Sequence, residues 1–260
     1  MLRSLYTAAT GMDAQQLRMD TIANNLANAN TTGYKKQRAE FEELLTEQLR
    51  APQSSSDGTG APVPLEVGLG VRAAATTRSL EQGELINTKG PLDVAIEGTG
   101  YFAIKQPSGD LLYTRAGNLR TDSSGHLVTV HGDPLDPDIT VPTDATSITI
   151  GRDGMVQATV PGQEQPQELG TIELTLFANP GGLVNLGRNL LGPSAASGEA
   201  QRVKPGERGA GSLSQGYLEN SNVQAVEEMV DMISTQRAYE LNSKVIQTAD
   251  QMLQKLTNLR

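Results

Sequence analysis

The sequence predicts an α+β protein in which long N- and C-terminal helices pair as a coiled coil, with an inserted all-β middle region, a small antiparallel, barrel-like sheet. Apolar residues recur at alternating steps of three and four near both ends of the 260-residue chain. Between these ends, short segments with a period of two alternate with turns that contain Gly, Asp and Ser. Each terminal helix alone would expose a long apolar row, so the two ends are expected to pair.

The N-terminal helix is predicted from a row of residues that keeps the three-four spacing over four heptads. The row comprises Leu5, Ala8, Met12, Gln15, Met19, Ile22, Leu26 and Ala29. The helix is expected to end at Thr31-Thr32-Gly33, because Gly33 can adopt the left-handed conformation that closes many helices. The helical pattern is then predicted to resume from Tyr34 to about Arg50.

The last forty residues, Ser221 to Arg260, are predicted to form one amphipathic helix. Ser221-Asn222-Val223-Gln224 matches a capping box, and no Pro or Gly follows it. The coiled-coil seam predicted from both ends consists of Leu5, Met12, Met19, Ile22, Leu26, Val230, Ile233, Leu241, Val245, Ala249, Met252, Leu256 and Leu259.

Further apolar residues of the C-terminal helix fall off this seam. They are Met229, Met232, Ile246 and Leu253. One partner helix covers only a narrow strip, so a second contact surface is expected, and a homopolymer would supply it. The alternative is that the two ends form the core of an ordinary globular domain. Both interpretations require the ends to pair, and they differ in whether other copies of the chain join in.

Short strands are predicted through the middle of the chain. They are Leu65–Val67, Gly70–Thr76, Leu92–Ile96, Tyr101–Lys105, Leu111–Thr114, Asn118–Thr121, His126–Val130, Ser147–Ile150, Met155–Thr159 and Thr171–Phe177. Hairpins are expected at Ser108-Gly109-Asp110 and Arg152-Asp153-Gly154. The Ser-, Gly- and Pro-rich stretch from Ala51 to Pro64 is interpreted as a linker.

Composition argues against several classes of function. The net charge is −9, the termini carry almost none of it, and no basic patch is present to neutralise phosphates. Trp is absent and only six Tyr and three Phe occur, so nucleic acid is not an expected partner. The chain has no cysteine, no apolar h-region near its start and no run of membrane-spanning length. Membrane insertion is therefore not expected.

No catalytic, cofactor-binding or metal-binding residue is predicted. Gly98-Thr99-Gly100 precedes a strand rather than a helix, so a tight turn is expected there in place of a phosphate site. His126 and His131 lie five residues apart in a strand-like segment, on opposite faces. The acidic loop at 133–138 lacks the Gly and distal Glu of a calcium loop. The sequence therefore predicts a protein that is not an enzyme.

The Asn-rich run 24–30 leaves two interpretations open. Asn24 and Asn28 lie one helical turn apart, and side-chain amides at that spacing can bond to neighbouring helices and fix their register. Alternatively, since Asn is a poor residue for a helix interior, the run marks the fraying end of the helix.

Several long motifs resemble the bacterial flagellar rod and hook axial protein family. The sequence of residues 23–35 is ANNLANANTTGYK, that of residues 216–223 is GYLENSNV, and that of residues 236–244 is QRAYELNSK. Residues 93–102 and 113–115 also match, so the resemblance covers essentially the whole chain. The motif residues singled out are Asn24, Asn25, Leu26, Asn28, Thr31, Gly33, Tyr34, Gln236, Arg237, Ala238 and Tyr239.

The resemblance implies a structural subunit of the distal rod that self-assembles into a hollow helical tube. Such a tube acts as a rigid drive shaft to the hook and forms part of the export channel. The implied partners are copies of the chain, proximal rod proteins, the hook protein, the surrounding L/P-ring bushing, the flagellar type III export apparatus and the rod cap. The alternatives are a proximal rod or hook-type protein of the same family, or a soluble ligand-binding β module. An enzyme that uses carboxylates is the weakest alternative.

The resemblance also implies a location and a division into domains. The subunit would lie in the periplasmic basal body after export without a cleaved signal. Residues 1–34 with 217–260 would form the coiled-coil core, and residues 81–191 an outer β domain. Residues 35–80 with 192–216 would connect them and include a rod-type insertion at 46–63, which becomes ordered between subunits.

Overall fold

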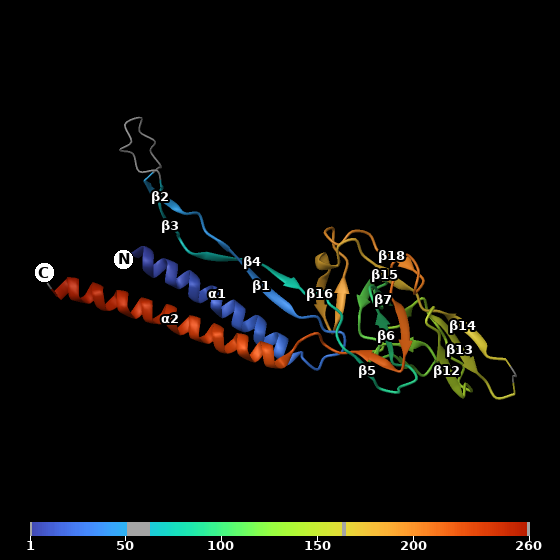
Figure 1. Ribbon diagram of the computed structural model, residues 1–260. Helices are drawn as coiled ribbons and strands as arrows, with labels where there is room; N and C mark the ends of the chain where they lie inside the picture. Colours follow the sequence, from blue (N-terminus) through green and yellow to red (C-terminus); the bar gives the residue numbers. More distant parts are fainter. Residues whose placement is uncertain (1, 51–62, 163–164, 259–260) are drawn as a thin grey trace. The chain divides into compact units, whose positions relative to one another are not determined.

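The computed structural model describes residues 2–50, 63–162 and 165–258, without the side chains of Leu2 and residues 256–258 (Figure 1). The chain divides into two compact units. The first, here called the helical unit, contains Met1–Ala27, Gln37–Arg78 and Gln224–Arg260. The second, the β unit, contains Asn28–Lys36 and Ser79–Val223. The α+β fold class is confirmed, and the three-part division into domains remains a prediction.

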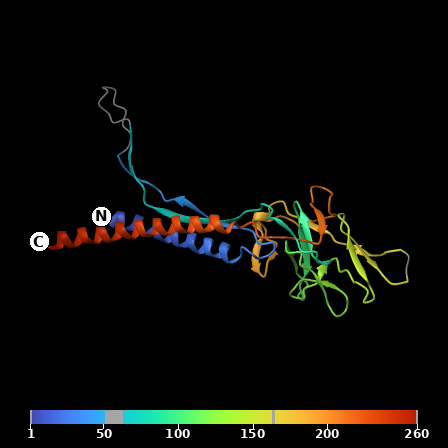
Figure 2. The ribbon, with the colours of Figure 1, turned by 60° about the horizontal axis from the view of Figure 1, so that its bottom comes forward.

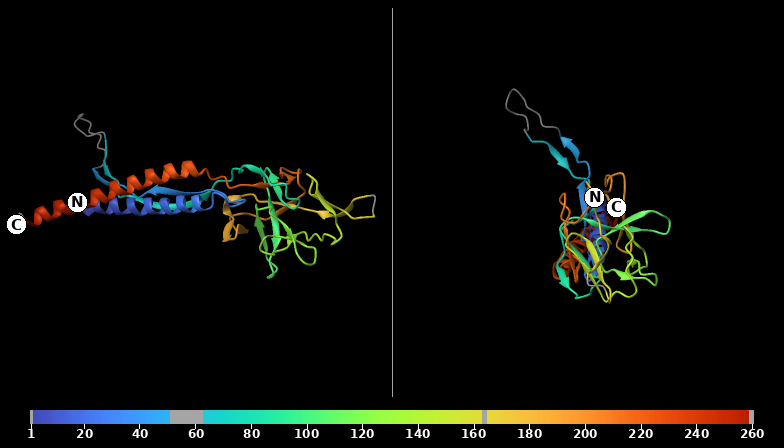
Figure 3. Two further views of the ribbon diagram at one scale, coloured as in Figure 1. Left: turned by 90° about the horizontal axis from the view of Figure 1, so that it is seen from below. Right: turned by 90° about the vertical axis from the view of Figure 1, so that its right-hand side faces the viewer.

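The helical unit is built on two long helices, α1 (Leu2–Ala27) and α2 (Ala225–Asn258). They lie side by side and antiparallel, as Figures 2 and 3 show from further directions. The predicted pairing of the two ends of the chain is therefore confirmed. The strands β1 (Gln37–Glu43) and β4 (Val71–Arg78) form an antiparallel ribbon that also packs against α1.

The predicted helix from Tyr34 to Arg50 is wrong. That segment contains β1 and a second strand, β2 (Glu47–Arg50), which pairs with β3 (Leu65–Val67). Polar cross-strand contacts support the β1–β4 pairing. The Oγ1 of Thr77 donates a hydrogen bond to Glu40 at 2.9 Å, and Arg72 pairs with Glu42. These contacts depend on residues some thirty positions later, and helical spacing within the segment itself does not reveal them.

The helix ends differ in detail from the predicted ones. α1 ends at Ala27, and a turn follows in which the amide of Thr31 bonds to Asn28 O at 3.1 Å. Gly33 has a φ of 70°, which confirms its left-handed conformation but places it well beyond the helix. At α2 the capping box does not form, since the Oγ of Ser221 accepts from the amide of Val223 at 3.3 Å, before the helix begins.

The β unit contains small antiparallel sheets. The largest has the order β16-β17-β8-β7-β15-β18, with β11 also paired to β7. Its strands are β16 (Val184–Gly187), β17 (Leu190–Gly192), β8 (Leu111–Thr114), β7 (Tyr101–Lys105), β15 (Leu174–Leu176), β18 (Gln201–Val203) and β11 (Leu135–Asp136). A short 3₁₀ turn, η1 (Pro180–Gly182), precedes β16.

The remaining sheets have two or three strands. One joins β12 (Ser147–Ile150), β13 (Met155–Thr159) and β14 (Gln167–Thr171). Three pairs join β19 (Ser212–Gln215) to β6 (Val94–Glu97), β20 (Tyr217–Glu219) to β5 (Leu85–Asn87), and β10 (Leu127–Val128) to β9 (Arg120–Thr121). The predicted bounds of β7, β8, β12 and β13 are confirmed, whereas the predicted strand Thr171–Phe177 is divided between β14 and β15.

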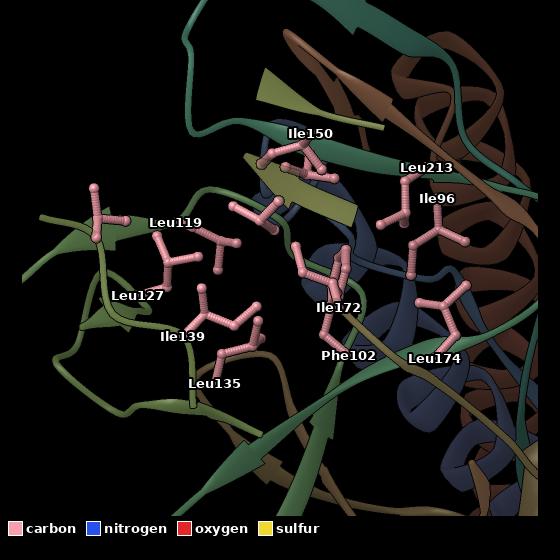
Figure 4. Packing of buried hydrophobic residues seen from close by; sticks show 13 residues of the cluster. Ile96, Phe102, Leu119, Leu127, Leu135, Ile139, Ile150, Ile172, Leu174 and Leu213 are labelled. Atoms are coloured by element: carbon pink, nitrogen blue, oxygen red, sulfur yellow. The ribbon is translucent and has the colours of Figure 1, made fainter. Parts of the chain in front are cut away.

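The core of the β unit gathers aliphatic side chains from several of these sheets (Figure 4). Phe102 and Ile172 lie together near its centre, and both they and Leu174 are fully buried. A second cluster is aromatic: the rings of Tyr113 and Phe177 meet edge to face with centroids 4.7 Å apart. The β unit therefore has a hydrophobic core of its own, independent of the helices.

Candidate assembly surface and polar anchors

The predicted N-terminal seam lies on covered surface of α1. Ile22 is buried, and Leu5, Met12, Met19 and Leu26 are half-buried. α1 packs against both α2 and the β1–β4 ribbon. The three-four row therefore identified covered positions of α1, and the spacing alone does not say which of the two elements each position meets.

In the single chain, most of the predicted C-terminal seam lies on the face of α2 that is turned away from α1. Five of its members are 46–63% exposed in the single chain: Val230, Ile233, Leu241, Val245 and Met252. Only Ala249, at 2%, is buried. The side chain of Leu256 and all of Leu259 lie outside the described residues.

The covered face of α2 is more polar than the exposed one. Glu228, Thr235 and Ala249 are almost fully buried, and the half-buried residues on the same side are Asp231, Met232, Ala238, Tyr239, Asn242, Ile246 and Leu253. This row also keeps the three-four spacing. α2 therefore has two rows with this spacing, one covered and one exposed. A search for apolar residues selects the exposed row, because it is the more apolar of the two.

We call the exposed row the α2 apolar face. It comprises Val226, Met229, Val230, Ile233, Leu241, Val245 and Met252. At roughly 100° per residue these positions fall within less than half of the helix circumference. The exposed residues Arg237 and Lys244 lie on the same side, so the face combines large apolar side chains with two cations. Exposed apolar surface of this kind is typical of a protein–protein contact.

Asn25 anchors the end of α1 to both other parts of the helical unit. Its Nδ2 donates to Glu228 Oε2 at 3.0 Å and to the carbonyl of Gln37 at 2.8 Å. Its Oδ1 accepts from the amide of Gln37 at 2.9 Å. Asn25 and Glu228 are each 1% exposed, so this polar contact is shielded from water.

The other Asn residues of the run lie elsewhere. Asn24 is exposed, and the half-buried Asn28 accepts a bond from Thr31 Oγ1 at 3.1 Å in the turn after α1. Asn25, which lies between these two residues, makes the hydrogen bond to α2 described above.

A buried ion cluster holds the two segments of the chain that enter and leave the β unit. Glu219, at 0% exposure, accepts from Lys35 Nζ at 2.6 Å and from Arg115 Nε at 2.5 Å. Its backbone carbonyl accepts from the amide of Gly33 at 2.8 Å. Lys35 also donates to the carbonyl of Glu81 at 2.6 Å. Burial lowers the pKa of Lys35, and the nearby Glu219 carboxylate opposes part of that change.

Arg115 completes the cluster by satisfying backbone carbonyls of one loop. It donates to Gly100 O at 2.7 Å and to Ile96 O at 3.2 Å, and it also bonds to Gly98. Gly98 and Gly100 have φ values of 109° and 133°, which confirms the tight turn predicted there. The guanidinium therefore fixes the turn between β6 and β7 against Glu219.

The remaining motif residues divide between the two units. Tyr34 is buried beside the ion cluster's Lys35, and Thr31 is half-buried in the preceding turn. Gln236 and Arg237 are exposed on α2, whereas Ala238 and Tyr239 are half-buried. Among the described residues no three His, Asp or Glu side chains could together hold a metal ion. None of the described helices is both long and apolar enough to cross a membrane.

Three family models match separate parts of the chain. The C-terminal model of the flagellar basal body rod FlgEFG proteins matches residues 214–259. The model of the D1 domain of the flagellar hook proteins FlgE/F/G matches residues 95–158. The model described as flagella basal body rod protein matches residues 5–35.

Curated relatives match over the full length. The flagellar basal-body rod protein FlgG of Caulobacter vibrioides is 51% identical, with all of both chains covered. The FlgG proteins of Buchnera aphidicola from Acyrthosiphon pisum and of Borreliella burgdorferi are each 48% identical. The matches cover all of this chain and, respectively, 100% and 99% of those relatives.

Proposed function

Because this chain belongs to the family of the flagellar basal-body rod protein FlgG and is a structural, non-enzymatic rod subunit, we propose that it polymerises into a hollow helical tube. The tube is the distal rod, which transmits motor torque to the hook as a rigid shaft and forms part of the export channel.

The α2 apolar face is the observation that carries the proposal. α1 already covers the opposite side of α2, so the pairing within one chain leaves this row exposed. Other copies of the chain present helices of the same kind. A contact between the α2 apolar face and a different surface of the next copy is heterologous, and such contacts build filaments when the rotation does not close. The predicted seam residues Val230, Ile233, Leu241, Val245 and Met252 are then contacts between subunits.

The ribbon beyond β1 and β4 supports the same proposal. β2 and β3 form a two-stranded sheet on which Leu49 and Leu65 are 51% and 50% exposed, and Val63, two residues before Leu65, is 66% exposed. A lone two-stranded sheet is at best marginally stable in water. We therefore propose that neighbouring subunits cover the rod-type insertion at 46–63, of which residues 51–62 lie outside the described part.

The proposed partners follow from membership of the family. They are further copies of the chain, the proximal rod proteins, the hook protein, the L/P-ring bushing, the rod cap and the flagellar type III export apparatus. The proposed location is the periplasmic part of the basal body, reached by export without a cleaved signal. The division into a coiled-coil core, a connecting domain and an outer β domain belongs to the same proposal.

Sedimentation and electron microscopy of the purified chain over a range of concentrations test the proposal. Tubes should appear as the concentration rises. A chain that stays monomeric at high concentration, with both helices already protected from amide exchange, would contradict the proposal. Deletion of the gene supplies a second test, since cells without a distal rod subunit should lack hook and filament. A soluble ligand-binding module would instead leave the flagella intact.

A further inference from the structure

At the contact between α1 and α2, a side chain of α2 also lies close to the backbone of α1, in addition to the bond between Asn25 and Glu228. At Gly11 a Cβ atom would lie 2.9 Å from Asn242 Nδ2, so the amide of Asn242 sits directly over this glycine. Gly11 and Asn242 are both half-buried. No residue other than glycine could accept Asn242 there without a shift of the side chain.

These two contacts share one register. The number of residues from Gly11 to Asn25 on α1 equals the number from Glu228 to Asn242 on α2. In an antiparallel pair, equal spacing means that a single alignment satisfies both contacts at once. The contacts lie about four helical turns apart, so they fix the alignment at two separate points.

We infer that Asn25–Glu228 and Gly11–Asn242 form a two-point lock that sets the register of the α1–α2 pair. The three-four spacing of the two covered rows does not choose a register by itself, because a shift by one heptad again brings the same two rows together. The bond between Asn25 and Glu228 does not survive such a shift, since the buried amide and carboxylate then lose each other as partners.

Each shifted alignment breaks the lock in a different way. Displacement by one heptad in one direction places Glu228 beyond Ala27, where α1 has ended. Displacement in the other direction places Asn25 before Ala225, where α2 has not begun. In either case a polar side chain that is now 1% exposed would lie in the contact without its present partner. Asn242 would also face Arg18 or Ser4 in place of Gly11.

Pairs of introduced cysteines can report the register, because the chain contains no cysteine of its own. The lock places Gln15 opposite Ala238, and one-heptad shifts place Gln15 opposite Asp231 or Val245. Three double variants carry Gln15→Cys with Ala238→Cys, with Asp231→Cys or with Val245→Cys. They are oxidised at a concentration where helix content is complete. A disulfide within one chain runs at monomer size on a non-reducing gel, which separates it from bonds between chains.

With the lock intact, the Gln15–Ala238 pair should cross-link within the chain at least tenfold more than either shifted pair. With Asn25→Leu and Glu228→Leu introduced together, the shifted pairs should reach comparable yields while helix content is retained. The double change is needed because Asn25→Leu alone would leave the Glu228 carboxylate buried without its amide partner. Adding Gly11→Ala to this double change should make the cross-link yields of the three cysteine pairs still more equal.

Two outcomes overturn the inference. One is that Gln15–Ala238 remains the dominant cross-link in the chain that carries Asn25→Leu and Glu228→Leu, here called the lock-free chain. The other is equal slippage in a control chain with Gln16→Leu and Asp250→Leu, an exposed amide and an exposed carboxylate on the same two helices. Irregular tubes from the lock-free chain are a further readout, and only that readout rests on the proposed function. If the unchanged chain forms no tubes, the proposed function fails, and the cross-links still decide the register.

Discussion

The Nζ of Lys35 lies 2.6 Å from a carboxylate oxygen of Glu219, which follows it by 184 positions in the chain. This bond joins the segment that enters the β unit after α1 to the strand that leaves it before α2. Arg115 and the amide of Gly83 bind the same carboxylate, which is fully buried. Glu219 therefore joins, inside the β unit, the segment that enters the unit to the strand that leaves it.

Replacement of Glu219 by Gln should destabilise the β unit strongly. The change keeps the size of the side chain but leaves Lys35 and Arg115 buried without their carboxylate. Loss of one partner of a buried ion pair costs about 3–5 kcal/mol. Urea unfolding, followed by a signal from the β unit, measures the change, and Glu199→Gln on the exposed surface is the matched control. Equal unfolding midpoints for the two variants would contradict the role of Glu219.

Titration of Lys35 should make the β unit more stable as the pH rises through the alkaline range. Burial holds the pKa of Lys35 below its ordinary value of 10.5, so the folded chain releases this proton before the unfolded chain does. Between the two pKa values the unfolded state binds more protons, and the free energy of unfolding therefore increases with pH. The window runs from the lowered pKa up to 10.5.

The comparison of the unchanged chain with Lys35→Met isolates this effect. Burial raises the pKa of Tyr113, which acts in the opposite direction, but Tyr113 titrates in both chains and its effect cancels from the difference. Stability of the unchanged chain relative to Lys35→Met should increase as the pH approaches 10.5. A relative stability that falls over this range would show that the protonated amine is favoured in the folded state.

Replacement of Gly33 by Ala should cost more than its left-handed backbone alone explains. A Cβ on Gly33 would lie 2.8 Å from the amide nitrogen of Ala116, and the φ of 70° adds about 1–2 kcal/mol for a residue with a side chain. Gly109→Ala is the control, because Gly109 has a φ of 94° and open space around it. Thermal unfolding should show the larger loss for Gly33→Ala, and equal losses would mean that the loop shifts freely.

The sequence predicted best the strands whose pairing is determined by residues close to them in the chain. The hairpin strands β7–β8 and β12–β13 were correct because short turns containing Gly109 and Gly154 fix them within a few residues. β1 was missed because its partner β4 lies beyond the 51–62 segment. The paired helices were predicted from spacing, but spacing could not decide which of two rows on α2 meets α1.

The polar anchors were beyond sequence reasoning for a similar physical reason. Glu219 and Asn25 each look like ordinary surface residues in the sequence, and only the long-range fold buries them. For Asn25 a weak signal existed, since the Asn-rich run suggested a register contact, but the rotation of the helix decides which Asn faces α2. A buried polar residue is identified by its partners, and those lie 184 and 203 positions away.

Dilute monomer should show the β unit protected from amide exchange while α1 and α2 exchange rapidly. The β unit has its own buried core around Phe102 and Leu174, whereas the helices leave much of their apolar surface exposed. Helical stability in proteins comes mostly from packing of an apolar face, and in a monomer the α2 apolar face has none. Strong protection of α2 in the monomer would contradict this.

Replacement of Leu241 by Asp should block assembly without unfolding the β unit. Leu241 is 63% exposed in the single chain, so the new carboxylate remains in water and costs the monomer little. In a contact between subunits the same carboxylate would be desolvated, which costs several kcal/mol. Sedimentation measures the loss of tubes, and exchange protection of the β unit confirms that it stays folded. Gln254→Asp, exposed at the edge of the same helix's apolar face, should still assemble. Tubes from Leu241→Asp at the unchanged critical concentration would remove the α2 apolar face from the assembly contact.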